Sequence, residues 1–350
     1  MRRILKTKDQ SLSRERALII TQTPMRITLG GGGTDVVWYS KLKGGAWISA
    51  AIGKYVFIFL NKTEDRNLIK ASHGIEATMT YDFREIPNPI IKECLKLTKV
   101  TKGIEITTLA DASAKSGLGG SGALEVGLLN ALYTYRNQPV DKLYLAKEAA
   151  EIEIRKLKMP VGPQDQYIAA LGGINYFEID TRGRVHVESL NLSFNTIAEL
   201  ESNLLFFRTR IQRDAVTVLS DQKKKIGKKS KQTEEIIRNL DEIKTLGQDV
   251  KKFLLKGKVD DFGASLHTHW LMKKKLSTLV SNPQIDEWYN QALRAGALGG
   301  KIMGAGGGGW FVFYVNKNKN SFRDRMQKIG LEERKVKFDW EGTKVLINLS

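Results

Sequence analysis

Glycine gathers in four short segments of this chain, and these segments constrain its backbone more than any other feature. They lie at 30–33, 117–122, 172–173 and 296–309. Glycine has no Cβ, so a cluster of glycines can turn tightly and can approach a ligand closely. We therefore expect four glycine-rich loops, set between the strands and helices that the apolar pattern predicts.

The apolar periodicity predicts strands mixed with helices. Strands are expected at 17–20, 46–52, 55–60, 104–109, 175–179, 204–207, 310–315 and 345–349. Helices are expected at 123–135, 141–157, 214–224, 234–255 and 286–294. The order lacks strict βαβ alternation, which favours the α+β class. The length of 350 residues suggests two domains, and the change between them is expected near 195–203.

Composition excludes several classes of protein. The single cysteine, Cys94, excludes an intramolecular disulfide framework and a cysteine-rich metal site. Four histidines argue against a histidine-rich zinc enzyme. No apolar run is long enough for a transmembrane helix, and the basic N-terminus lacks the apolar stretch of a signal peptide. A cytoplasmic protein is therefore expected.

The formal net charge of +18 favours anionic ligands such as nucleotides and sugar phosphates. Part of the excess is local, because 1–16 hold six basic and two acidic residues and 223–231 hold six lysines. We interpret these runs as a solvated tail and a solvated helix face. The lysine run has no interleaved aromatic residue, which argues against nucleic-acid binding.

The segment 113–123 is the strongest chemical signal. It follows the expected strand 104–109 and opens the helix that begins near Ala123. A helix N-terminus preceded by glycines offers free N–H groups to an anion, so the loop predicts a phosphate cradle. The hydroxyl of Ser121 lies where a metal could be held. The residues assigned to ATP or phosphate binding are Ser116, Gly117, Leu118, Gly119, Gly120, Ser121 and Gly122.

Two better-known phosphate loops do not fit. The Walker A pattern occurs nowhere in the chain. The spacing G-x-G-x-x-G occurs at 117–122 and at 304–309. The first is followed by a helix and then another helical segment, and the second by a strand, so neither has the βαβ context of a dinucleotide site.

Two further loops carry carboxylates. Asp35 ends the segment 23–35, where it could accept hydrogen bonds from sugar hydroxyls or cap a glycine turn. Asp165 lies in the Pro/Gly-restricted segment 160–167, ahead of a short helix. It could act on a ligand or cap that helix, and the residues alone leave both alternatives open.

Four segments carry a family resemblance: PMRITLGGGGTD, SAKSGLGGSGA, VGPQDQYIAALGG and KIMGAGGGGW. Three of them, PMRITLGGGGTD, SAKSGLGGSGA and KIMGAGGGGW, resemble in this order the three signature motifs of the GHMP small-molecule kinases. The resemblance covers about 18–349 and is closest to the D-glycero-D-manno-heptose 7-phosphate kinase branch. Two departures stand out. Gly120 replaces the usual motif serine, and 207–215 differ from the branch's usual segment.

The resemblance implies a two-domain α+β fold after a basic N-terminal extension at 1–17. The domain at 18–200 would resemble the second domain of ribosomal protein S5, and the domain at 201–350 would be ferredoxin-like. The enzyme would use ATP and Mg²⁺ to phosphorylate the anomeric hydroxyl of a sugar phosphate for nucleotide-activated heptose. The alternatives are a kinase of a fucose- or arabinose-type sugar and a catalytically silent binding protein. ATP and a small anionic sugar would be the partners, with no nucleic acid and no membrane, and a homodimer is left open.

The resemblance also implies residue roles. Asp165 would be the base and Arg26 would stabilise charge on the transferred group, while Ser121 and Glu153 would hold the metal. We further predict that Arg213 and Lys301 contact the substrate's own phosphate. The full set implied for substrate binding is Arg26, Thr34, Asp35, Gly173, Arg213, Lys301, Gly304 and Gly306.

Overall fold

The computed structural model describes residues 17–212, 214–226 and 230–350. Most of the predicted N-terminal extension (1–16), part of the lysine run (227–229) and Arg213 lie outside the described residues. Among the described residues, no helix combines the length and the apolar character that crossing a membrane requires.

The first sheet has eight strands in the order β12-β1-β2-β5-β3-β4, with β6 on β2 and β7 on β6. β3 pairs with β5 in parallel, and the other pairs are antiparallel. The strands are β1 (Ile19–Gly30), β2 (Gly45–Lys62), β3 (Ile69–His73), β4 (Glu76–Thr80), β5 (Ile104–Ala110), β6 (Ile174–Ile179), β7 (Val185–Ser189) and β12 (Lys344–Asn348).

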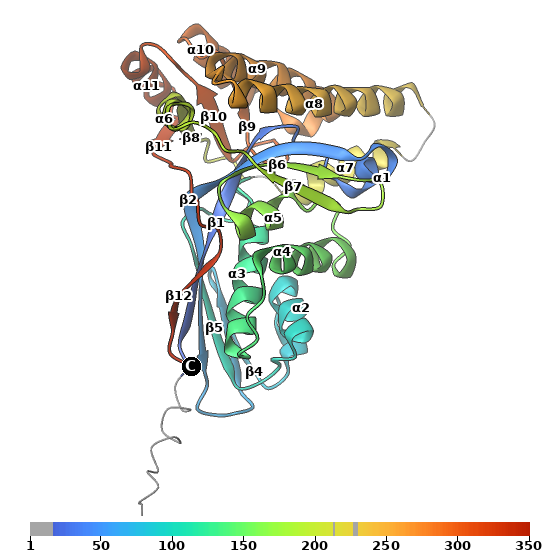
Figure 1. Cartoon of the computed structure of the whole chain (residues 1–350), viewed down its shortest axis with the longest axis vertical. Coiled ribbons are helices and arrows are strands. Elements are labelled where there is room, and N and C mark those ends of the chain that lie inside the picture. The colour runs from blue at the N-terminus through green and yellow to red at the C-terminus, as the bar shows by residue number, and fades with distance from the viewer. Residues whose placement is uncertain (1–16, 213, 227–229) are drawn as a thin grey trace, which may run out of the picture.

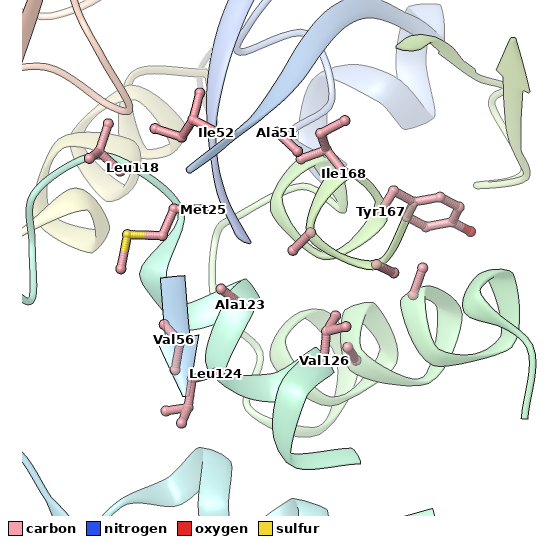
Figure 2. Packing of buried hydrophobic residues seen from close by; sticks show 14 of the residues in the cluster. Met25, Ala51, Ile52, Val56, Leu118, Ala123, Leu124, Val126, Tyr167 and Ile168 are labelled. Atoms are coloured by element: carbon pink, nitrogen blue, oxygen red, sulfur yellow. The ribbon is translucent and has the colours of Figure 1, made fainter. Parts of the chain in front are cut away.

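Helices cover one face of this sheet, and apolar side chains fill the layer between them. Figure 2 shows side chains of β1, β2, α3 and α5 meeting there. The helices of this half are α1 (Val37–Lys43), α2 (Pro89–Thr98), α3 (Gly120–Tyr135), α4 (Lys142–Glu151) and α5 (Gln164–Leu171), with short turns η3 (Phe83–Glu85) and η4 (Ile152–Lys156). Because α3 is buried along most of its length, its N-terminus and the glycine loop before it are held in a fixed position.

The second sheet is antiparallel, in the order β11-β8-β10-β9. Its strands are β8 (Leu204–Arg208), β9 (Gly299–Ile302), β10 (Trp310–Tyr314) and β11 (Glu332–Arg334). The long helices α8 (Lys231–Leu255) and α9 (Val259–Leu276) pack on each other. Aromatic rings build much of the core, and those of Phe311 and Phe313 stack at 4.8 Å. The remaining elements are α6 (Phe194–Asn203), α7 (Ala215–Ile226), η5 (Thr278–Val280), α10 (Pro283–Arg294) and α11 (Lys319–Lys328).

The last strand of the chain returns to the first sheet. β12 pairs antiparallel with β1, and Thr23 Oγ1 lies 2.8 Å from Thr343 Oγ1. Figure 1 shows β12 (red) beside β1 (blue). The chain's final strand therefore packs with the residues that the sequence assigned to the N-terminal domain, although it falls within the predicted C-terminal unit at 201–350.

The α+β class is confirmed, but several predicted elements change form. The strands expected at 46–52 and 55–60 are one continuous strand, β2. The strand expected at 17–20 continues to Gly30 because it pairs with β2 along that whole length. The helix expected at 141–157 instead divides into α4 and the π-helical turn η4, which contains Glu153. Single π-helical turns inside helices occur often at functional sites.

Candidate active site

A cavity of about 430 Å³ brings together most of the predicted site residues. Its wall is formed by β1, the glycine loop before α3, the loop before α5, helix α9 and strand β9. The predicted residues in the wall are Arg26, Asp35, Ser116, Gly117, Gly119, Gly120, Ser121, Glu153, Asp165, Lys301 and Gly304. Segments from both sheets therefore contribute to one pocket.

Some predicted site residues lie outside this wall and serve packing. The hydroxyl of Thr34 donates to the carbonyls of Gly31 and Ala46, so it fixes the glycine turn and does not face the cavity. Gly173 continues the edge of the first sheet, where its carbonyl accepts from the Ala51 N–H. The predicted residues outside the wall are Thr34, Leu118, Gly122, Gly173 and Gly306.

Two consecutive residues at the start of α5, Gln164 and Asp165, connect the segments that form the site. The side chain of Gln164 accepts hydrogen bonds from Thr28 and Ser49. Asp165 accepts two hydrogen bonds from Arg26, Nε to Oδ1 at 2.7 Å and Nη2 to Oδ2 at 3.0 Å. A two-pronged pair of this kind fixes the carboxylate in orientation as well as position.

The alternative that Asp165 caps its helix is wrong. The N-cap of α5 is Pro163, which makes no side-chain cap bond, and Asp165 lies within the first turn. Its carboxylate pairs with Arg26 and lines the cavity, where the side chain is 23% exposed.

The glycine loop packs directly on the ion pair. Gly119 has φ +78°, and a Cβ there would lie 3.0 Å from Arg26 Cγ and 3.2 Å from Asp165 Cγ. Gly117 has φ +81°, and a Cβ there would lie 2.6 Å from the Met303 carbonyl oxygen. Glycine is required at both positions by conformation and by space. The glycine loop thus packs on the side chains of the ion pair and on the backbone of the loop after β9.

Asp35 is a buried carboxylate in the cavity wall. The backbone N–H of Gln164 donates to its Oδ2 at 3.4 Å. Burial, with the negative charge of Asp165 as the next contribution, raises the pKa of Asp35 to about 6. Below that pH the side chain is neutral, and above it the protein holds a buried charge that is suited to accepting hydrogen bonds from hydroxyl groups.

This raised pKa predicts a pH-dependent effect of Asp35→Asn on the ligand-free protein. The native state holds the Asp35 proton up to about pH 6, whereas the unfolded chain releases it near pH 3.8. The wild-type protein therefore loses stability as the pH rises between these values. The Asn variant has no carboxyl group at this position and does not lose that stability. We expect the Tm of the variant relative to wild type to rise from pH 4 to pH 6 and then level off. A Tm difference that is constant across this range would contradict the prediction.

Glu153 and Ser121 form the predicted metal-binding pair. A hydrogen bond from Ser121 and another from Gln166 reach the Glu153 carboxylate. Burial, followed by the charge of Asp165, raises the pKa of Glu153 to about 7. A hydroxyl and a carboxylate are hard oxygen donors of the kind Mg²⁺ prefers when nucleotide phosphates complete its shell, so the pair fits that ion.

Sequence reasoning missed a second glutamate behind this pair. Glu125 is fully buried in α3 and accepts a hydrogen bond from Gln166 Nε2 at 3.0 Å. Its other oxygen has no hydrogen-bond partner among the described residues. Burial and the nearby charge of Glu153 raise the pKa of Glu125 well above its ordinary value. A glutamate in an otherwise apolar helix was the signal that could have found it.

Sequence reasoning also missed two basic residues of α9. His269 and Lys273 are buried and line the cavity. They belong to the stripe of buried positions at spacings of three and four that includes Leu266, Trp270 and Leu276. A stripe of this kind is normally apolar, so a histidine and a lysine within it were the signal that could have pointed to these two residues.

Comparisons with known proteins agree with this geometry. The family model described as "GHMP kinases N terminal domain" matches residues 88–173, and "GHMP kinases C terminal" matches residues 250–329. A D-glycero-alpha-D-manno-heptose 7-phosphate kinase of Campylobacter jejuni is 34% identical over 314 residues, which cover 86% of this chain and 90% of that protein. The chain belongs to the GHMP kinase family.

Other relatives of this GHMP kinase span the family. A galactokinase of Pyrococcus furiosus is 25% identical, with 92% of this chain and 95% of that protein covered. The crystal structure of a D-glycero-D-manno-heptose 1-phosphate kinase from Bacteroides thetaiotaomicron superposes with a TM-score of 0.76 at 27% identity. The superposition covers 94% of this chain and 99% of that one. The predicted two-domain GHMP fold is confirmed, and the protein is a phosphotransferase with an alcohol group as acceptor.

Proposed function

We propose that this kinase transfers the terminal phosphoryl group of ATP to the anomeric hydroxyl of D-glycero-D-manno-heptose 7-phosphate. The product, a 1,7-bisphosphate, would serve the synthesis of nucleotide-activated heptose for surface polysaccharide. The observation that carries the proposal of phosphoryl transfer is the Arg26–Asp165 pair packed against the glycine loop in one cavity. The choice of heptose rests on the Campylobacter jejuni relative. With ATP as the donor, the cytoplasm is the proposed compartment.

Catalysis of phosphoryl transfer consists mostly of positioning the reactants and stabilising charge. The residues of the cavity would share these two tasks. The glycine loop and the N-terminus of α3 would hold the nucleotide phosphates through backbone N–H groups. Asp165 would accept the proton of the attacking hydroxyl at a carboxylate oxygen. Arg26, 7% exposed in its side chain, would hold that carboxylate and offset charge on the transferred group. An anomeric hydroxyl is more acidic than an ordinary alcohol, which eases the demand on the base.

GHMP kinases use ATP, typically with Mg²⁺. In this chain Ser121 and Glu153 would hold the ion, as their donor set allows. When bound, Mg²⁺ neutralises charge on the nucleotide phosphates. The hydrogen bond between Ser121 and Glu153 keeps both side chains turned toward the same point of the cavity.

We expect Ser121→Ala to weaken the use of Mg-ATP more than the binding of sugar. The variant removes one hard oxygen donor and one hydrogen bond to Glu153. Losing a hydrogen bond to a charged group corresponds to about a tenfold rise in the KM for Mg-ATP. Steady-state kinetics at several Mg²⁺ concentrations measure the change. Unaltered Mg²⁺ dependence together with an unaltered KM for ATP would reject this role.

The proposed function is tested by ADP release with a panel of acceptors: heptose 7-phosphate, heptose 1-phosphate, free heptose, fucose and arabinose. We expect heptose 7-phosphate to give the highest kcat/KM, and ³¹P NMR of the product to show a phosphate on the anomeric carbon. Preference for heptose 1-phosphate or for an unphosphorylated sugar would replace the proposed acceptor. Absence of ADP release with every acceptor would indicate a silent binding protein.

A further inference from the structure

Three basic side chains form a row in the wall of the cavity. Lys301 from β9 is 3% exposed, His269 is 2% exposed and Lys273 is 9% exposed. Lys301 Nζ lies 2.9 Å from His269 Nδ1. Lys273 Nζ donates to the carbonyl of Ile302 at 3.0 Å and to the carbonyl of Gly304. All three residues line the same pocket.

Within the described residues, this row lacks an anionic partner. The recorded bonds of both lysines go to backbone carbonyls and to an imidazole, not to carboxylates. Apart from burial, the influences that lower the pKa values of the two lysines are other cations, Lys273 and Arg26. These effects bring the pKa of Lys273 to about 7, and they hold that of Lys301 well below its ordinary value.

Burial without a counter-charge disfavours the charged form of a lysine, which is why the pKa values of Lys273 and Lys301 are lowered. An anionic ligand that enters the pocket offsets this effect, because it supplies the missing counter-charge and accepts hydrogen bonds from the amines. The row is therefore suited to a group with several negatively charged oxygens, such as a phosphate.

The row extends away from the nucleotide loop. Lys273 lies at the near end, because it donates to Gly304, and a Cβ on Gly304 would lie 2.7 Å from Gly117 Cα. At the far end, His269 is bonded to Lys301 and to the backbone of Gly32, on the turn that precedes Asp35. Through His269, Lys301 is therefore linked to the turn that carries Asp35, a carboxylate suited to accepting hydrogen bonds from sugar hydroxyls.

We propose that Lys301, with His269 and Lys273, binds the phosphate group that the acceptor already carries. The inference rests on the proposed function and adds to it the feature that selects a phosphorylated sugar over a free one. The row holds the acceptor by its phosphate, and Asp165 is then free to meet the hydroxyl at its other end. His269 and Lys273 join Lys301 in a role that the sequence assigned to Lys301 and Arg213.

The test uses Lys301→Met, with Lys275→Met as the matched control. Lys275 lies on α9 with its side chain exposed, so the control makes the same chemical change outside the cavity. Thermal melts are recorded with and without inorganic phosphate, in saturating Mg²⁺ and AMP-PNP so that the nucleotide loop is filled. We expect phosphate to raise the Tm of wild type and of the control but not of Lys301→Met. Without phosphate, the Tm of Lys301→Met should equal or exceed that of wild type, because the variant removes a buried amine that has no anionic partner among the described residues.

A second measurement uses the acceptor itself. We expect Lys301→Met to raise the KM for heptose 7-phosphate about 10- to 100-fold, with the KM for ATP little changed. If Lys301→Met does not fold, Lys301→Gln, which keeps a polar end for His269, takes its place in both measurements.

Two results would overturn the inference. One is a phosphate-induced rise in Tm that is as large in Lys301→Met as in wild type. The other is the absence of any phosphate response in nucleotide-loaded wild type. Failure of the proposed function is distinguishable from both. If no sugar supports ADP release while the phosphate response still depends on Lys301, then the anion site stands and the proposed reaction falls.

Discussion

Asp165→Asn is expected to give a folded protein whose kcat is lower by about 10²–10⁴-fold, the usual contribution of a positioned general base. The amide keeps the shape of the carboxylate but cannot take a proton. It also leaves Arg26 with one acceptor on residue 165 in place of two, beside the Gly117 carbonyl. An unsatisfied, nearly buried donor costs about 1–3 kcal/mol, so a lower Tm is expected as well. Nucleotide binding, measured with a fluorescent ATP analogue, should persist, because the backbone of the glycine loop is unchanged.

The matched control is Asp180→Asn, which removes an aspartate from a surface pair with Arg184 at 2.7 Å. This pair is remote from the cavity wall, and exposed pairs contribute little, so the control should keep its kcat and nearly its full Tm. Wild-type turnover by a folded Asp165→Asn variant would remove Asp165 from the proposed mechanism. It would leave the Arg26–Asp165 pair with a purely structural role.

Gly119→Ala is expected to lower kcat by about 100-fold while the protein stays folded. The left-handed backbone at Gly119 costs a residue with a Cβ about 1–2 kcal/mol. The new methyl group would also press on the side chains of Arg26 and Asp165 at 3.0 and 3.2 Å. The ion pair must move to relieve this contact, and displacing a catalytic group by about 1 Å can cost a factor of about 100 in rate.

Gly183→Ala separates backbone strain from crowding of the ion pair. Gly183 has φ +84°, close to the +78° of Gly119, and a Cβ there would meet nothing within 4 Å. The control should therefore lose similar stability and keep its activity. Equal kcat values for Gly119→Ala and Gly183→Ala would show that contact between the glycine loop and the ion pair does not matter for turnover.

The local features of the site could be predicted from the sequence. The glycine loop before α3 was found because its signal is contained in a few consecutive residues: a strand, a run of glycines and a helix start. Such a run restricts the backbone wherever it is placed in the molecule. The order of the motifs likewise indicated the GHMP family and its α+β fold before any contact was known.

The uses of individual side chains were settled by contacts between distant parts of the chain. Thr34 lies beside Asp35 at the end of the GGGGTD motif, where a binding role was predicted, yet its hydroxyl is bonded to the loop's own backbone and to β2. The terminal strand β12 joins the first sheet because β1 offers it a free edge. Sequence pattern alone cannot distinguish such cases, because hydrogen-bond partners and sheet edges depend on where other segments pack.

The sequence by itself determined the family, the glycine loop before α3 and the presence of Asp165 in a restricted turn. Only the tertiary structure decided that Asp165 is held by Arg26 and not by its helix, since these residues are 139 positions apart. It also decided that two residues of α9 and one of β9 form a row of buried basic side chains. The physical reason is the same in both cases. Local backbone constraints are encoded in neighbouring residues, whereas the desolvation and pairing of charges depend on every segment that packs around them.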